Sequence, residues 1–174
     1  MSRIDFVTGA PERYIGEVRA LAAVPDRLRL ALAGQTDEAL RRSPPGAEWS
    51  PVRVLAHLLS YARHSREFIY RIAWMEEPES VIWDEADEVE REGWERLGGA
   101  ELLALIRSEI ESTVALLSGT PDASWGRPGL HPIRGRRSLR QQVRGHIDHL
   151  EEHIGQIEAA LTASGAASGA GSNG

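Results

Sequence analysis

The sequence predicts an all-α protein, a four-helix bundle with one long crossover connection. Apolar residues recur at helical spacing in four separate segments of the chain. No alternating run of β-branched residues is bounded by hairpin turns, so strand signals are nearly absent. The length of 174 residues suits a single domain with a sizeable core. Amphipathic helices joined by one long connection are typical of a helical bundle.

The first two helices are predicted at residues 11–33 and 50–74. The first contains Pro25, which has no backbone N–H, so we expect either a kink or two shorter helices there. A short extra turn is expected to start at Thr36. The second long helix should begin after Ser50, which can act as an N-cap and is followed directly by a proline.

The second half of the chain predicts two more bundle helices, at residues 100–117 and 138–161. Residues 76–98 are acidic and interrupted by proline and glycine, which indicates a long crossover that is helical only in part. Residues 118–136 are expected to form a loop because of their glycine and proline content. The third bundle helix should bury one apolar stripe, made of Leu103, Ile106, Ile110, Val114 and Leu117.

Residues 1–163 are expected to form the bundle domain, followed by a flexible Gly/Ser/Ala tail at 164–174. The N-terminal segment lacks the layout of a signal peptide. No apolar run approaches the roughly 20 residues that span a bilayer. We therefore expect a cytoplasmic protein without a membrane partner.

Composition limits the chemistry that the protein can perform. The net charge of −6 does not suggest a nucleic-acid partner. The chain contains no cysteine, which excludes disulfides, thiolate ligands and cysteine nucleophiles. It also contains no lysine, which excludes lysine nucleophiles and Schiff bases. Any bound metal must therefore be held by histidine, aspartate or glutamate.

Three of the six histidines fall within eight positions of the fourth predicted helix, at His146, His149 and His153. On a helical wheel they lie within about 60° of one another, along one flank of the apolar stripe, so we expect all three to be semi-buried. His149 and His153 are one turn apart, a spacing at which two imidazoles can bind one metal ion. His146 with His149 is the weaker pair. Alternatively, these histidines are only solvated or hydrogen-bonded.

A metal site inside a bundle also needs ligands from a facing helix. His57, on the second predicted helix, lies beside that helix's apolar stripe and is the residue that could supply one. His64 lies two turns further along and is too far away to share a metal with His57. We interpret His64 as a surface residue or as a contact of the site's ligands.

Several motifs, in order along the chain, resemble those of the DinB-like family. The sequence GAEWSPVRVLAHL is followed by a helix ending in FIYR, an acidic crossover, and then HPIRGRRSLRQQVRGHIDHLEEHIGQI. The most specific pieces are the WS before a helix with one histidine, and the late HxxxHxxQI. The resemblance covers residues 13–161 and is greatest to the branch that contains bacillithiol transferases and metal-dependent hydrolases.

The resemblance implies a DinB-like four-helix bundle whose metal ligands are His57, His149 and His153. Three histidines that leave other positions open are typical of a catalytic site rather than a structural one. The ion would be divalent zinc, nickel, manganese or iron. The resemblance also implies a homodimer. Family members often carry an acidic residue one turn after the second-helix histidine, but here no carboxylate follows before Glu67. His146 or the crossover carboxylates are the residues that could replace it.

The function implied is that of a metal-dependent transferase that uses a low-molecular-weight thiol cofactor and acts on a small-molecule substrate. The alternatives are a metal-dependent hydrolase with the same three-histidine site, or a non-enzymatic stress-response bundle that binds metal or a small molecule. Arg71, Arg134 and Arg137, with the neighbouring Arg136, are candidates to bind the carboxylates of a thiol cofactor or substrate. No catalytic side chain is predicted.

Overall fold

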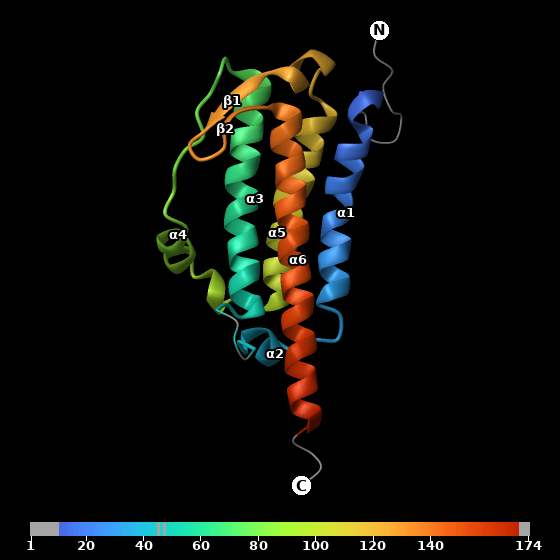
Figure 1. The fold of residues 1–174 in the computed structure, drawn as a ribbon, viewed down its shortest axis with the longest axis vertical. Coiled ribbons are helices and arrows are strands. Elements are labelled where there is room, and N and C mark those ends of the chain that lie inside the picture. The colour runs from blue at the N-terminus through green and yellow to red at the C-terminus, as the bar shows by residue number, and fades with distance from the viewer. Residues whose placement is uncertain (1–10, 45, 47, 171–174) are drawn as a thin grey trace.

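The computed structural model describes residues 11–44, 46 and 48–170, with side chains up to Ser164. Four long helices run side by side (Figure 1). Helices α1 and α3 lie diagonally across the bundle, and each packs against both α5 and α6. The predicted four-helix bundle is therefore confirmed. The bundle helices are α1 (Ile15–Ala31), α3 (Pro51–Trp74), α5 (Gly99–Ser118) and α6 (Leu139–Ala170).

Short helices lie before and between the long ones, and two of them fall where the sequence predicted helical turns. The expected extra turn is α2 (Asp37–Arg41), whose N-cap Thr36 accepts a hydrogen bond from the backbone N–H of Ala39 at 3.2 Å. The crossover between α3 and α5 is helical only in part, as predicted, and lies outside the bundle against α3 (Figure 1). The remaining short elements are η1 (Glu12–Tyr14), α4 (Glu85–Glu92), η2 (Trp94–Arg96) and η3 (Asp122–Gly126).

The ends of the long helices follow their local sequence in most places. Ser50 Oγ accepts a hydrogen bond from the backbone N–H of Arg53, which caps α3 as expected. Pro25 is buried within α1, which remains a single helix. Helix α6 continues to Ala170, past the predicted end near Leu161, because no proline follows to stop it. The segment expected as a flexible tail is thus helical up to that point, and 171–174 lie outside the described residues.

The segment predicted as a loop between α5 and α6 contains a β-hairpin that the sequence did not predict. Strands β1 (Pro128–His131) and β2 (Gly135–Ser138) pair in an antiparallel register. Gly135 has a φ of +68°, which favours glycine at the end of a three-residue hairpin loop. His131 Nδ1 accepts hydrogen bonds from the two backbone N–H groups of the loop, each at 3.2 Å. The hairpin lies where α3 ends and α6 begins (Figure 1).

The hairpin packs closely on α3 through Gly129. A Cβ added at Gly129 would lie 2.5 Å from Ile72 Cγ1 and 3.0 Å from Phe68 Cζ. The Gly129→Ala variant should therefore lower the free energy of unfolding by about 1–3 kcal/mol, because the added methyl group overpacks this contact. Urea denaturation measures the effect. Gly126→Ala is the matched control, since no atom lies within 4 Å of its added Cβ, and equal losses in both variants would contradict this packing.

The core lies between the four long helices, and its position on α5 differs slightly from the prediction. Leu103 and Val114 are only partly buried, because the buried face is rotated toward residues one position earlier. The buried face of α5 includes Leu102, Ile106, Ile110, Thr113 and Leu117.

No helix among the described residues is both long and apolar enough to cross a lipid bilayer. The homodimer stays a prediction.

Candidate metal centre

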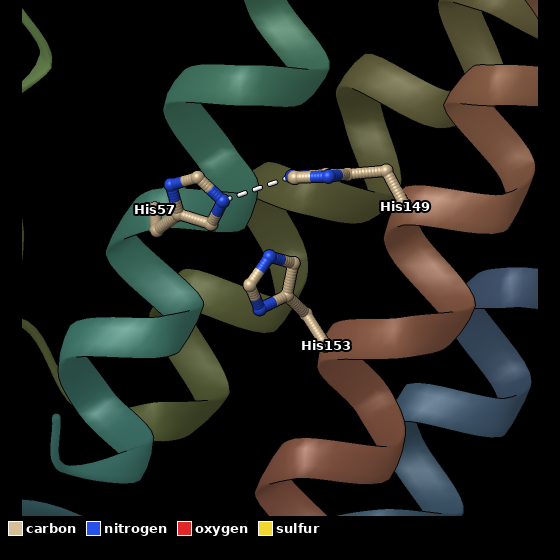
Figure 2. A group of neighbouring side chains, drawn as sticks. All are labelled: His57, His149 and His153. Atoms are coloured by element: carbon tan, nitrogen blue, oxygen red, sulfur yellow. Dashed lines mark hydrogen bonds between the residues drawn. The ribbon is translucent and has the colours of Figure 1, made fainter. Parts of the chain in front are cut away.

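The structure brings together the three histidines on which the resemblance placed a metal. His57 projects from α3 and meets His149 and His153, which project from successive turns of α6 (Figure 2). The ring centroid of His57 lies 5.1 Å from that of His149 and 4.5 Å from that of His153. One nitrogen from each ring lies within 4.8 Å of the other two. Among the described residues, this is the one group of histidine and acidic side chains close enough to hold an ion in this way.

The donor set fits a divalent metal ion. His57 Nε2 lies 2.9 Å from His149 Nε2. Two imidazole nitrogens bound to one tetrahedral zinc ion stand about 3.3 Å apart, given Zn–N bonds of about 2.05 Å. The two Nε2 atoms would therefore need to move apart by only a few tenths of an ångström to bind the ion, a shift that small side-chain rotations can supply. Three neutral nitrogen ligands would leave further positions for water or substrate, as in catalytic zinc sites.

Hydrogen bonds on the far side of two rings set which nitrogen faces the centre. His57 Nδ1 lies 2.7 Å from Glu85 Oε2, and His153 Nδ1 lies 2.7 Å from Gln156 Oε1. A carboxylate oxygen and an amide oxygen both accept, so each Nδ1 carries the proton and donates it. Each Nε2 is then left unprotonated in the neutral ring. This pairing is usual for metal-bound histidines, whose second nitrogen donates to an oxygen acceptor.

Burial keeps the cluster in the form that binds metal. The pKa of His149 is lowered to about 3, first by burial and then by repulsion from the rings of His153 and His57. The pKa of His153 is also lowered, again mainly by burial. Both rings are therefore neutral at physiological pH, and a neutral imidazole is the form that ligates a metal ion.

His146 does not join the cluster, and it is more deeply buried than the predicted flank position implied. Its side chain is fully buried, and neither ring nitrogen has a hydrogen-bond partner. Burial lowers its pKa to about 4. Its ring lies 5.4 Å from that of Tyr61, between α3 and α6. The expectation of a semi-buried residue was wrong for His146, because α3 packs against α6 there and places the ring of Tyr61 beside it.

Aromatic rings enclose the histidine cluster. The ring of Tyr61 lies 3.7 Å from that of His149, and the ring of Trp49 lies 5.3 Å from that of His57. The pKa of Tyr61 is raised by burial, and hydrogen bonds with Ser65 and Arg134 oppose that shift. These two rings pack against the cluster and reduce its contact with solvent, and electrostatic interactions are stronger where less water is present.

Two of the predicted arginines lie beside the cluster, and one lies far from it. A Cβ added at Gly145, one turn before His149, would lie 3.1 Å from Arg137 Nη2 and 3.2 Å from Arg134 Nη1. Both guanidinium groups therefore rest on α6 next to the cluster. Arg71 is fourteen residues after His57 on the same helix, about 21 Å along the axis. The structure does not bring it to the site.

The charges of Arg134 and Arg137 remain available to a ligand. Among the described residues, no carboxylate lies within 4.0 Å of either guanidinium. Arg137 donates instead to the backbone carbonyl of Gln141 at 2.7 Å. The neighbouring Arg136 is different, because it forms an ion pair with Glu77 at the surface.

The carboxylate nearest the cluster comes from the crossover helix. The sequence left open whether His146 or a crossover carboxylate replaces the acidic residue that family members carry near the second-helix histidine. In the structure the residue beside His57 is Glu85, a crossover carboxylate. Spacing alone did not single it out, because the hydrogen bond joins residues 28 positions apart in different helices. His64 lies outside the cluster. Its Nε2 lies 3.0 Å from Glu88 Oε2, and its ring stacks on Trp83 at 4.2 Å.

Comparison with solved structures shows the same fold in two proteins. YfiT from Bacillus subtilis, described as "a probable metal-dependent hydrolase with an unusual four-helix bundle topology", aligns with a TM-score of 0.79 and 22% identity. The match covers 88% of this chain and 89% of YfiT. The mycothiol-dependent maleylpyruvate isomerase aligns with a TM-score of 0.69 and 12% identity. That match covers 82% of this chain but 60% of the isomerase, and a mutant of the same enzyme gives the same TM-score.

The family follows from the sequence. At these identities the structural matches establish the fold alone, and no curated protein matches the sequence significantly. A sequence model of the DinB superfamily, however, matches residues 20–157, which include the whole of α3 and α5, most of α1 and α6, and the three clustered histidines. This chain belongs to the DinB superfamily.

Proposed function

We propose that the protein is a divalent-metal-dependent transferase that conjugates a low-molecular-weight, anionic thiol to a small electrophile. The observation that carries this proposal is the convergence of His57, His149 and His153 next to two guanidinium groups without carboxylate partners. The mycothiol-dependent isomerase, which has the same fold, uses a small thiol. The absence of cysteine is in keeping with a thiol that comes from outside the chain.

The three histidines would hold the ion, which would be zinc, nickel, manganese or iron. A divalent ion in such a site lowers the pKa of a bound thiol or water, so that a nucleophile forms near neutral pH. Glu85 and Gln156 keep the Nδ1 protons of His57 and His153 on the far side of the rings. Tyr61 and Trp49 limit the access of bulk water to the cluster.

Arg134 and Arg137 would bind the anionic group of the thiol. Both guanidinium groups lie over Gly145, one turn from His149, so a short molecule could contact the arginines and the metal together. A side chain at residue 145 would occupy the space that these groups fill. Guanidinium groups bind carboxylates through paired, charge-assisted hydrogen bonds, which orient the ligand as well as hold it.

A metal-dependent hydrolase is the second candidate, and the similarity to YfiT favours it. That match covers nearly the whole of both chains, and YfiT is described as a probable hydrolase. The same three histidines would then serve to activate water instead of a thiol. The two candidates differ in one respect that can be measured: only the transferase needs a thiol.

A panel of electrophiles, assayed with zinc- or nickel-loaded protein in the presence and absence of small thiols, tests the proposal. Product formation that depends on both metal and thiol would support the transferase. Turnover of esters or amides without thiol would establish the hydrolase instead. Stoichiometric metal binding with neither reaction would make the protein a non-enzymatic binding bundle.

Arg134→Gln and Arg137→Gln should each raise the KM for an anionic thiol by about 10-fold or more, because each removes a charge-assisted hydrogen bond of about 1.5–3 kcal/mol. The kcat should change little, since neither side chain is a proposed metal ligand. Steady-state kinetics with an anionic thiol and a neutral one separate the charge effect from any distortion of the site. Arg136→Gln is the matched control, because that side chain is paired with Glu77. Equal increases of KM for both thiols would contradict the proposed subsite.

A further inference from the structure

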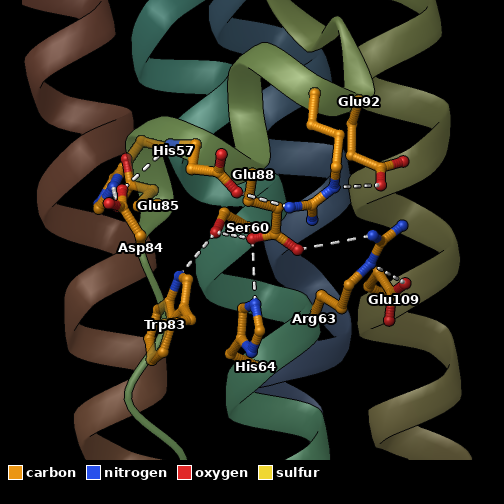
Figure 3. Close-up of polar contacts among 12 residues, drawn as sticks. His57, Ser60, Arg63, His64, Trp83, Asp84, Glu85, Glu88, Glu92 and Glu109 are labelled. Carbon is orange, nitrogen blue, oxygen red and sulfur yellow. Dashed lines mark hydrogen bonds and ion pairs between the residues drawn. The ribbon is translucent and has the colours of Figure 1, made fainter.

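Two carboxylates on the crossover helix α4 face the bundle helix that carries His57. Glu85 and Glu88 are three residues apart, so they lie on the same side of α4. They meet His57 and Ser60, which are three residues apart on α3 (Figure 3). The two helices are thus joined at two matching points, one of which is a histidine of the proposed metal centre.

The contact at Glu88 anchors α4 to α3. Glu88 is 6% exposed, and its Oε2 accepts hydrogen bonds from Ser60 Oγ at 2.5 Å and from His64 Nε2 at 3.0 Å (Figure 3). Ser60 is fully buried, and its Oγ also accepts a hydrogen bond from Trp83 Nε1 at 3.0 Å. Polar groups buried in this way are costly to leave unpaired, so the anchor resists separation of the two helices.

The contact at Glu85 fixes the orientation of His57. Glu85 Oε2 accepts from His57 Nδ1 at 2.7 Å, and Glu85 Oε1 accepts from Arg53 Nη2 at 3.3 Å. Both carboxylate oxygens are therefore occupied by residues of α3, one turn apart. The start of α4 is itself defined by Asp84, whose Oδ1 accepts from the backbone N–H of Asp87 at 3.0 Å. Glu85 thus follows directly on a capped, well-defined helix start.

We propose that Glu85 is the positioning residue for His57 in the metal centre, and that Glu88 holds Glu85 in place. The inference rests on the proposed metal site and adds to it the part of the chain that prepares one ligand. Glu85 Oε2 accepts the Nδ1 proton of His57, which leaves Nε2 as the nitrogen that faces His149 and His153. The crossover, which contributes no side chain to the histidine cluster itself, therefore controls how well the cluster binds metal.

Removing the carboxylate should weaken metal binding while the bundle stays folded. Loss of an acceptor behind a metal-bound histidine usually lowers metal affinity by about 10- to 100-fold, and we expect this range for Glu85→Ala. Glu85→Gln should lose less metal affinity than Glu85→Ala, since an amide oxygen can still accept a hydrogen bond from His57 Nδ1. Glu88→Ala should weaken binding in the same direction but by less than Glu85→Ala, because it acts only through the placement of α4. Glu90→Ala, at an exposed position of the same helix, should have no effect.

The test uses the full chain and has two independent readouts. Competition of Zn²⁺ between the protein and a chelator gives the metal affinity of each variant, with circular dichroism to verify folding. Nitrogen-15 NMR of the histidine rings, recorded without metal, gives the tautomer of His57. In the wild type, His57 should be protonated on Nδ1, and Glu85→Ala should give a mixture of the two neutral tautomers. A change in stability alone would not produce this tautomer shift.

Wild-type affinity in Glu85→Ala together with an unchanged His57 tautomer would overturn the inference. A loss of affinity in Glu90→Ala equal to that in Glu85→Ala would also overturn it, because the effect would then belong to the charge of α4 and not to this contact. If the wild type shows the Nδ1 tautomer, and Glu85→Ala loses it, but neither protein binds Zn²⁺, the positioning role stands and the proposed metal-dependent function fails.

Discussion

The His149→Ala variant should bind divalent metal at least about 100-fold more weakly than the wild type, since a zinc site worth about 10–16 kcal/mol and held by three histidines draws at least about 3 kcal/mol from each of them. His149 contributes the nitrogen that lies 2.9 Å from His57 Nε2, so its removal breaks this pair and leaves two of the three ligands. His57→Ala and His153→Ala should lose affinity to a similar extent. Isothermal titration of the metal-free proteins with Zn²⁺ measures all three.

The remaining histidines provide controls in the same chain. His64→Ala and His131→Ala should bind metal as the wild type does, because neither ring belongs to the cluster. His146→Ala tests the register of α6, since His146 lies one turn before His149. Its side chain is buried, and neither of its ring nitrogens has a hydrogen-bond partner. The variant should retain metal binding even if it is less stable. Loss of binding in His146→Ala together with binding in His149→Ala would mean that the ligands are assigned one turn too late.

The long helices were predictable because their signals are local. Ser50 followed by proline sets the start of α3, and apolar residues at helical spacing mark the buried faces of the bundle helices. The convergence of His149 and His153 also follows from spacing within one helix. His57 was assigned to the same site through the family resemblance, because a contact between α3 and α6 has no signature within either helix.

The parts that sequence did not predict depend on contacts between distant segments. Glu85 reaches His57 only because α4 packs on α3, and neither partner carries a local mark of this contact. The hairpin formed by β1 and β2 was missed because each strand has only four residues, of which two in β1 are proline and glycine and one in β2 is glycine. Its stability comes from packing of Gly129 on α3 and from backbone hydrogen bonds with the crossover at Pro78 and Ser80. Helix α6 extends beyond its predicted end because a Gly/Ser/Ala composition without proline does not by itself end a helix.

The stability of the metal-free protein should fall as the pH drops from 7 to 5, largely because of the buried histidines. His146 has its pKa lowered to about 4 in the folded chain by burial, whereas in an unfolded chain its pKa is near 6.5. Between these two values the unfolded state binds more protons than the folded state, so acid favours unfolding. The contribution is fully present above about pH 6.5 and is lost as the pH falls toward 4.

The His146→Leu variant isolates this contribution. At about 1.4 kcal/mol per pKa unit, the wild type should lose about 2 kcal/mol more than the variant between pH 7 and pH 5. At pH 7 the variant should be at least as stable as the wild type, because leucine has a similar volume and His146 makes no hydrogen bond that would be lost. Urea denaturation in the presence of a chelator, at pH 7, 6 and 5, gives both curves. His149 is retained in both proteins, so the effect of burial on its pKa is common to both curves. Parallel curves across this range would mean that His146 is protonated equally in the folded and unfolded chains, and that water reaches it between α3 and α6.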